Sequence, residues 1–151
     1  MVPKMKMIDC STMYLPFLCR VLNYHPTVLA QCITCTENGK PLAGVVYDAY
    51  NGRSISAHIW MDAERTPSRA WYAAILDYPF NRLGVTKLVG QVASNNIEAI
   101  KLDTHMGFVE EARVKDYSDD GDLIIYTMTR EQCRILNSPA WSKVVQLVGG
   151  C

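Results

Sequence analysis

Histidine is the side chain best suited to move protons at neutral pH, and the chain has three of them. His58 lies in an alternating segment, residues 54–62, which predicts a strand with His58, Trp60 and Asp62 on one face. A histidine and a tryptophan on one face of a central strand could line a binding cleft. A hydrogen-bonded core histidine fits the pattern equally well. His105 falls near the end of a predicted helix, where we expect it to cap that helix or to be exposed.

An anion site is a second candidate, directly after this strand, where a helix is predicted to begin. The segment consists of Arg65, Thr66, Pro67, Ser68, Arg69 and Ala70. Its threonine–proline pair predicts an N-cap at Thr66 and a proline in the first helical position. A helix start attracts anions, and the two arginines could add charge-assisted hydrogen bonds to phosphate. Taken alone, the segment fits an ordinary capped helix with solvated arginines better, because most helices begin without a ligand.

Asp103 is a carboxylate that borders the apolar face of another predicted helix. Ala99 precedes it by four residues and Met106 follows it by three, so the three lie on one side of the helix. Such a carboxylate lies at the edge of a cleft or is solvated at the flank of the helix. The position alone favours solvation.

Cysteine pairs can bind metals, and the chain has one Cys-x-x-Cys pair. The six cysteines are Cys10, Cys19, Cys32, Cys35, Cys133 and Cys151. The pair, Cys32 and Cys35, falls in a predicted strand, where residues three apart point to opposite faces. No second cysteine pair or close histidine pair completes a metal site. We therefore expect no metal and no disulfide at this pair, but buried, reduced thiols.

Three Asn-Gly or Asp-Gly pairs, which favour tight two-residue turns, predict hairpins between the strands. Asn38-Gly39 separates residues 30–36 from 42–50, Asn51-Gly52 separates residues 42–50 from 54–62, and Asp120-Gly121 separates residues 113–117 from 123–129. The first two turns predict a three-stranded antiparallel meander, and the third predicts a later hairpin.

Helical patterns precede and follow the meander. A helix over residues 11–23 would be interrupted at Pro16, and a second helix would run from Pro67 to Tyr78, where Pro79 ends or kinks it.

The remaining elements complete the order of the fold. Residues 87–93 predict a short strand, and Asn95 with Glu98 has the capping-box spacing for a helix that Gly107 would end. The tail, residues 138–151, predicts a short helix or partial disorder. This order predicts an α+β fold, with helices packed on one sheet, in a single domain over residues 1–151.

Composition excludes several classes of protein. The chain has 151 residues, 49% of them hydrophobic and 20% charged, with a formal net charge of zero. A nucleic-acid-binding domain usually has a clear basic excess, which is missing here. No apolar run approaches the roughly 18 residues of a spanning helix, and no signal-peptide pattern begins the chain. We therefore expect a cytoplasmic protein without a membrane partner.

Taken together, these segments resemble the GNAT N-acetyltransferase superfamily over residues 42–136. The residues that match its pyrophosphate loop, Q/R-x-x-G-x-G/A, are Arg65, Ser68 and Ala70, with Ser68 in place of a glycine. The residues that match its later signature in spacing are Asn96, Ala99, Gly107 and Phe108. Residues 77–80 and the chain ending resemble a branch of small GNAT-like proteins common in bacteria and phages. The matching residues of the ending are Glu111, Arg113, Asp120, Gly121, Asp122, Tyr126, Met128, Arg130, Glu131 and Cys133.

The resemblance implies a GNAT-like fold, with a central, mostly antiparallel sheet and helices on both faces. It implies that acetyl-CoA is a cosubstrate, that no metal takes part, and that a primary amine attacks the thioester directly. The residues implied to bind CoA are Trp60, Met61, Arg65, Thr66, Pro67, Ser68, Arg69, Ala70 and Asn96. As in the family, a backbone N–H near Trp60 or Met61 should hold the thioester carbonyl, where the strand splays from its neighbour.

Direct attack requires a neutral amine, and only about one alkylamine molecule in 2,500 is neutral at pH 7. A base would assist, with His58 as the first candidate and Glu64 and Asp62 as second choices. Where the family often has a tyrosine as general acid, this chain has Asp103, which donates a proton at neutral pH only if burial raises its pKa. Otherwise the acid lies elsewhere, water protonates the thiolate, or the protein binds CoA without acetylating efficiently.

Two classes of function follow. One is an active N-acetyltransferase; the other is a CoA-binding or protein-interaction module that kept the fold and lost the chemistry. The acceptor stays open among a small-molecule amine, a protein amine and an aminated nucleotide, and so does a homodimer. If a phage encodes the chain, the compartment would be the host cytoplasm.

Overall fold

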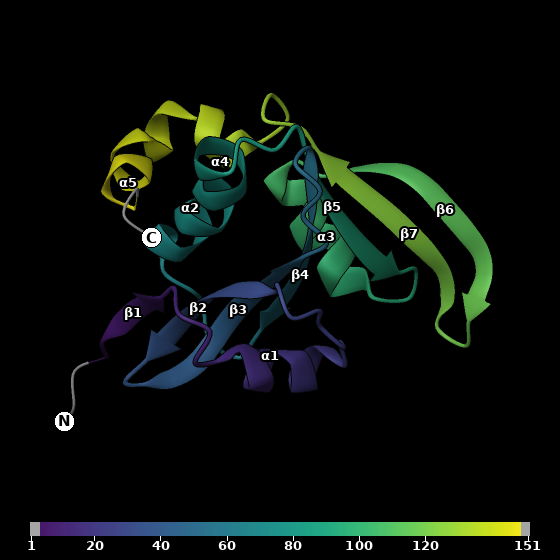
Figure 1. The fold of residues 1–151 in the computed structure, drawn as a ribbon, viewed down its shortest axis with the longest axis horizontal. Coiled ribbons are helices and arrows are strands. Elements are labelled where there is room, and N and C mark those ends of the chain that lie inside the picture. The colour runs from purple at the N-terminus through teal and green to yellow at the C-terminus, as the bar shows by residue number, and fades with distance from the viewer. Residues whose placement is uncertain (1–3, 149–151) are drawn as a thin grey trace.

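The computed structural model describes residues 4–148, which form a seven-stranded sheet with helices on both faces (Figure 1). The strands are β1 (Lys6–Asp9), β2 (Gln31–Glu37), β3 (Lys40–Asp48), β4 (Ser54–Met61), β5 (Lys87–Ala93), β6 (Val109–Ser118) and β7 (Gly121–Met128). The helices are α1 (Leu15–Leu22), α2 (Arg69–Asp77), α3 (Ile97–Met106), α4 (Arg134–Asn137) and α5 (Ser142–Leu147), with a π-helical turn η1 (Tyr78–Arg82) and a 3₁₀ turn η2 (Pro139–Trp141). The predicted α+β architecture is confirmed.

The strands follow the order β1-β2-β3-β4-β5-β7-β6, and all neighbours are antiparallel except β4 and β5. These two parallel strands are paired only where residues 54–56 face residues 87–89. Beyond that point β4 continues to Met61 and β5 to Ala93 without further pairing between them. The sheet is therefore closed at one end of the β4–β5 pair and open at the other.

Helix α1 covers one face of the sheet, where Leu18 packs against Gly44 of β3. A Cβ atom at Gly44 would lie 2.3 Å from a methyl carbon of Leu18, so glycine permits this close approach. Helices α2, α4 and α5 cover the other face (Figure 1). Cys32 packs in the cluster beneath α1 and Cys35 in the larger cluster beneath α2, and both are free thiols. The predicted opposite orientation of this pair is therefore confirmed.

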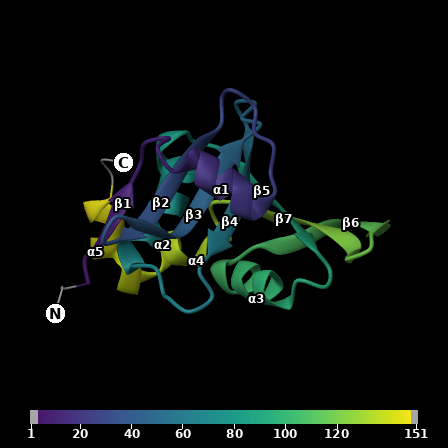
Figure 2. The same cartoon turned by 90° about the horizontal axis from the view of Figure 1, so that it is seen from below.

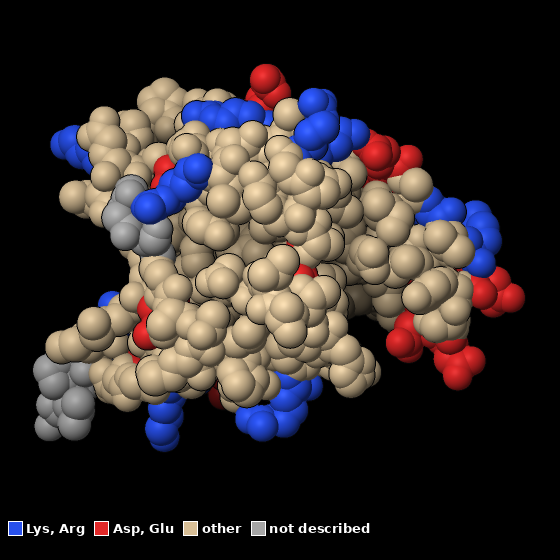
Figure 3. All heavy atoms as spheres, in the orientation of Figure 1, with Lys and Arg blue, Asp and Glu red and all other residues tan. Residues whose placement is uncertain are grey.

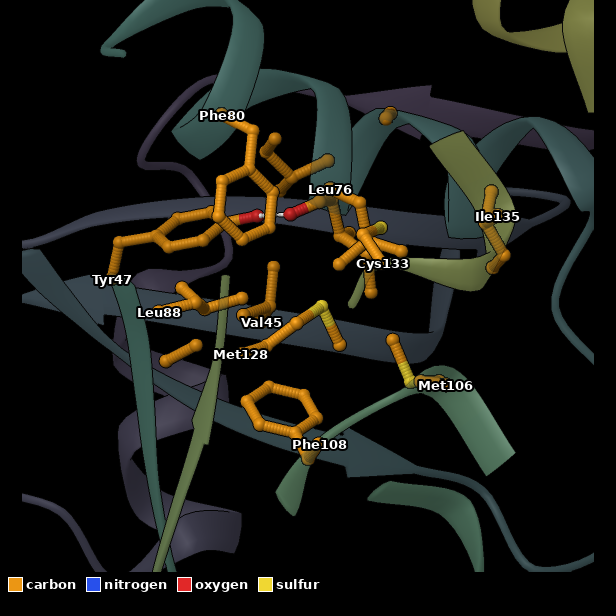
Figure 4. Packing of buried hydrophobic residues seen from close by; sticks show 14 of the residues in the cluster. Val45, Tyr47, Leu76, Phe80, Leu88, Met106, Phe108, Met128, Cys133 and Ile135 are labelled. Atoms are coloured by element: carbon orange, nitrogen blue, oxygen red, sulfur yellow. Dashed lines mark hydrogen bonds between the residues drawn. The ribbon is translucent and has the colours of Figure 1, made fainter. Parts of the chain in front are cut away.

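The larger core joins the last strands to the middle of the sheet. In Figure 4, Met106 of α3 and Phe108, which follows that helix, lie beside Met128 of β7. Farther along the same core, the Tyr47 hydroxyl donates a hydrogen bond to the carbonyl of Ile75 in α2 (Figure 4). This packing anchors the carboxyl end of α3, while Ile97 and Glu98 at the start of the helix stay exposed.

Two of the predicted turns differ from the expectation. Asn38 and Gly39 both have positive φ angles, 51° and 81°, as a tight turn requires. The two-residue turn predicted at Asn51 is wrong, because β3 already ends at Asp48 and residues 49–53 form a longer loop. The last hairpin turns at residues 119–120, and Gly121 is already paired with Ser118.

The helix boundaries require further corrections. Ser68, not Thr66, caps α2, and its side chain accepts a hydrogen bond from the Trp71 N–H. Asn96, not Asn95, caps α3 by accepting from the Ala99 N–H.

Pro16, Pro79 and Gly107 were each predicted to interrupt or end a helix. Pro16 lies in the first turn of α1 and so begins this helix instead of interrupting it. Pro79 does not stop the helical path, which continues as η1. Gly107 ends α3 at φ 117°, as predicted.

The β6–β7 hairpin extends beyond the rest of the sheet (Figure 1 and Figure 2). Every residue of β6 is exposed, and acidic side chains gather at the end of the hairpin (Figure 3). Arg113 of β6 forms ion pairs with Glu110 and Asp122, so part of this charge is neutralised within the hairpin. Among residues 4–148, no helix is long and apolar enough to cross a membrane.

Candidate active site

The opening between β4 and β5 leaves backbone groups of β4 without a strand partner. The Asp62 N–H donates to the Leu42 carbonyl at 2.8 Å, and the β3–β4 register continues without a shift. Because backbone direction alternates along a strand, the N–H groups of His58 and Trp60 also face β3. Those of Ile59 and Met61 face the opening. The thioester-binding N–H expected near Trp60 or Met61 can therefore come from Met61 but not from Trp60.

Two adjoining cavities fill this opening. The inner cavity, about 240 Å³, lies between β4 and β5 and is bordered by α3. Its lining residues include Tyr24, His58, Gln91, Asn96 and Asp103. A larger groove of about 1050 Å³ continues between the end of β4 and α3, and Ile59 and Asn96 line both spaces. A ligand in the groove could therefore place one end in the inner cavity.

His58 is half-buried on β4, on the face opposite the larger core. Its ring stacks on the ring of Tyr24, with centroids 4.1 Å apart and an interplanar angle of 30°. Burial lowers the pKa of His58 below its usual 6.5, and the charge of Asp48 partly opposes this effect. The imidazole is therefore mostly neutral at pH 7, which is the form that can accept a proton.

Asp103 is buried, with 7% of its surface exposed, and lines the same cavity as His58. Burial raises its pKa from 3.8 to about 7. Among residues 4–148, no side chain forms an ion pair with it, and none donates a hydrogen bond to its carboxyl group. At neutral pH a large fraction of Asp103 therefore carries a proton, so it could act as an acid.

The start of α2 keeps free N–H groups, as the sequence predicts for an anion site. Within the described residues, the N–H groups of Arg69 and Ala70 have no hydrogen-bond partner. Pro67 is buried, whereas Thr66 is exposed and its carbonyl accepts a hydrogen bond from the Lys6 ammonium at 2.7 Å.

Both arginines of this segment are already engaged by the protein. Arg65 forms ion pairs with Glu37 at 3.2 Å and with Asp62 at 3.1 Å. Arg69 donates to the Ala140 carbonyl at 3.0 Å, and its guanidinium lies 4.3 Å from the centroid of the Trp141 ring. Arg69 stays exposed, as expected for a solvated arginine, whereas Arg65 is half-buried between two carboxylates.

The alternative bases occupy different positions. Asp62 lines the outer groove, and its pKa is lowered by a hydrogen bond from the Glu64 N–H and by Arg65. Glu64 is exposed and lines neither cavity. His105 is exposed at the last turn of α3, where it also lines the outer groove. The structure thus brings together His58, Asp103 and Asn96, and leaves Glu64 apart.

Tyr24 and Asp48 are two residues of this site that sequence reasoning missed. Tyr24 lies in the loop after α1, more than thirty positions before His58. Asp48 ends β3 and accepts a hydrogen bond from the Tyr24 hydroxyl at 2.7 Å. The only signal in the sequence was that Asp48 is a lone acidic residue in an otherwise apolar strand. This signal does not indicate that Tyr24 is its hydrogen-bond partner.

No protein-family model and no curated protein match the sequence, but solved structures match the fold. A spermidine N-acetyltransferase from Vibrio cholerae, in complex with CoA and spermine, has a TM-score of 0.66 and 17% identity over 84% of this chain and 96% of that chain. A dodecameric structure of the V. cholerae spermidine N-acetyltransferase, in an intermediate state, has a TM-score of 0.66 and 19% identity over 89% and 98%. Ribosomal-protein-S5-alanine acetyltransferase from Vibrio fischeri has a TM-score of 0.62 and 12% identity over 86% and 98%.

At such low identities the similarity shows the fold alone. It covers most of each chain, and the mixed sheet with its single parallel pair, β4 and β5, agrees with it. The chain therefore has the GNAT-like fold that these acetyltransferases share.

Proposed function

We propose that the protein is an N-acetyltransferase that transfers an acetyl group from acetyl-CoA to a primary amine. One observation carries the proposal: the opening between β4 and β5 places a half-buried histidine with a lowered pKa and a buried carboxyl group with a raised pKa around the inner cavity, and the unpaired backbone N–H groups of Ile59 and Met61 lie along this cavity and the adjoining groove. These are the base, the acid and the hydrogen-bond donors that direct acyl transfer requires.

The chain's own groups fit CoA in two places. CoA has an amide-bearing arm and a pyrophosphate. The N–H of Ile59 and the carbonyl groups of Ile59 and Met61 could pair with the amides, as a strand partner would, which leaves the Met61 N–H for the thioester. The free N–H groups of Arg69 and Ala70, at the start of α2, could bind the pyrophosphate. Both placements are proposals, as is the part of Asn96 at the junction of the two cavities.

The residues would divide the work in the following way. When bound, acetyl-CoA supplies the acetyl group as a thioester. His58 accepts a proton from the incoming amine, and the Met61 N–H donates a hydrogen bond to the carbonyl oxygen as negative charge develops there. Asp103 gives its proton to the departing sulfur.

A thiol-release assay with acetyl-CoA tests this function. Spermine, spermidine and a peptide with an N-terminal alanine are sensible first acceptors, because one structural neighbour is a spermidine N-acetyltransferase in complex with spermine and another is named as a ribosomal-protein-S5-alanine acetyltransferase. We expect at least one primary amine to stimulate thiol release, and the His58→Ala and Asp103→Asn variants to lose most of that stimulation. Thiol release that no amine stimulates would contradict the proposal.

A CoA-binding module without transfer is the second candidate. The engagement of Arg65 and Arg69 within the protein, together with Ser68 in the place of a glycine, favours it. Calorimetric titration with CoA separates the two: binding without amine-stimulated thiol release would support the module.

A further inference from the structure

We propose that Asp48 is a positioning residue for His58, and that it acts through the ring of Tyr24. This inference rests on the proposed function, in which His58 is the base. Three groups from separate parts of the chain carry it: a carboxylate at the end of β3, a phenol after α1 and an imidazole on β4.

The side chain of Asp48 is held in place by several hydrogen bonds. It is 3% exposed and accepts hydrogen bonds from the Tyr24 hydroxyl at 2.7 Å, the Thr27 N–H at 2.8 Å and the Thr27 hydroxyl at 2.5 Å. Burial opposes its ionisation, but these bonds and one from the Ala49 N–H lower its pKa to about 2. Asp48 is therefore a rigid, permanently charged anchor for the Tyr24 hydroxyl.

Tyr24 is held at both ends, because its hydroxyl is bound by Asp48 and its backbone N–H donates to the Cys19 carbonyl at 2.9 Å. Burial, followed by the hydrogen bond to Asp48, raises the pKa of Tyr24 to about 12, so the hydroxyl remains a donor. The ring between these two anchors is the one that stacks on His58.

No other described side chain orients His58. Within residues 4–148, neither ring nitrogen of His58 has a hydrogen-bond partner. Histidine bases are commonly oriented by a carboxylate bonded to one nitrogen, which fixes the tautomer as well. Here the carboxylate would act one step away, through a stacked ring, and both nitrogens of His58 stay available to the cavity.

Three titratable groups lie around His58, and the residues that β5 contributes to the cavity are neutral. The three groups are Tyr24 in the loop after α1, Asp48 on β3 and Asp103 on α3. Removing the charge of Asp48 should lower the pKa of His58 further, because that charge favours the imidazolium. Removing the Tyr24 ring should raise the pKa toward 6.5, because water then reaches the imidazole.

The experiment is a proton NMR titration of the histidine ring signals, combined with the thiol-release assay. His25 and His105 are exposed and provide internal references, and a His58→Gln variant assigns the third signal. Tyr24→Phe keeps the ring and loses the anchor, Tyr24→Leu loses the ring, and Asp48→Asn loses the charge. Thr27→Val is the matched control, since it removes a hydrogen bond to Asp48 but leaves Tyr24 in place.

We expect Tyr24→Leu to abolish the ring-current shift of His58, and Tyr24→Phe to reduce it. The pKa of His58 should rise in Tyr24→Leu and fall in Asp48→Asn. The kcat of Tyr24→Phe should fall roughly tenfold, with an unchanged KM for acetyl-CoA. Thr27→Val should lower the melting temperature and leave the His58 signal in place.

An unchanged His58 signal in both Tyr24→Phe and Asp48→Asn would overturn the positioning role and leave Asp48 as a loop anchor. Wild-type protein without amine-stimulated thiol release would instead overturn the proposed function. The NMR spectrum reports the contact between the rings of Tyr24 and His58 whether or not the protein is an active acetyltransferase.

Discussion

His58 and Asp103 have opposite protonation tendencies within one cavity. Burial disfavours the charged form of each group, so it makes the histidine a neutral acceptor and the aspartate a neutral donor. The same apolar surroundings thus prepare both partners of an acid–base pair. Substitution of His58 and substitution of Asp103 should therefore change the pH dependence of activity in different ways.

The His58→Ala variant should lower kcat/KM by roughly 10²-fold or more at pH 7. The loss should shrink as the pH rises, because more of the amine is then neutral without help. Because the pKa of His58 is lowered, most of the His58 side chains should already be in the neutral base form at pH 6.5. The activity of the wild type should therefore not require a higher pH to deprotonate this residue. Steady-state rates from pH 5.5 to 9.5 measure this.

His25→Ala is the matched control, since that histidine is exposed and lines neither the inner cavity nor the outer groove. Circular dichroism must first show that His58→Ala folds. Full activity of a folded variant at pH 7 would move the role of base to Asp62, Glu64 or a water chain.

The Asp103→Asn variant should make the protein more stable and less active. An aspartate with a pKa of about 7 when folded and an ordinary value of 3.8 when unfolded takes up a proton on folding between these values. The free energy of unfolding therefore falls as the pH rises through this window, in total by on the order of 4 kcal/mol. The asparagine variant avoids this loss, so its melting temperature should exceed that of the wild type at pH 8 but not near pH 4.

Asp48→Asn provides the comparison, because this buried aspartate has a lowered pKa and contributes stability above pH 4. It should lower the melting temperature at pH 8. Equal melting temperatures of Asp103→Asn and the wild type at pH 8 would show that Asp103 is not held neutral by burial.

Among the elements, the loop between β4 and α2 differs most from its sequence pattern. Thr66 and Pro67 have the right order for a helix start, yet the helix begins two residues later. Arg65 is drawn to Glu37, and Lys6 binds the Thr66 carbonyl, so contacts with β1 and β2 keep this stretch extended. Local propensity could not reveal partners that lie about thirty and sixty positions away.

The Arg65→Glu variant tests whether this loop belongs to the CoA site. It places a third carboxylate beside Glu37 and Asp62, so repulsion should displace the loop and the free N–H groups at the start of α2. We expect the Kd for acetyl-CoA in calorimetric titration to rise by about tenfold or more, which corresponds to roughly 1.4 kcal/mol.

Lys115→Glu makes the same change of charge on the β6–β7 hairpin and should leave the affinity unchanged. If Arg65→Glu binds as well as the wild type, the loop does not contribute to the site.

For the whole molecule, the sequence predicted the order of the elements between residues 11 and 129, missed strand β1 and helix α4, and predicted the contacts poorly. The strand over residues 87–93 and the turn at Asn38 came out as expected, because period and turn chemistry are local properties. The loop after Asp48 did not, because the buried hydrogen bonds of Asp48 to Tyr24 and Thr27 end β3 early. The site depends on such distant contacts, which explains why Tyr24 was missed.

The unpaired stretch of β4 should divide one strand into two sets of amide protons with different exchange rates. In protein without ligand, the amides of Ile59 and Met61 face the opening and should exchange with deuterium quickly. Those of His58 and Trp60 face β3 and should exchange slowly. A ligand that lies along β4 as a substitute strand would slow the fast set and hardly change the slow one. Residue-resolved exchange with and without CoA would therefore trace the path of the bound molecule, one alternate residue at a time, before any acceptor is known.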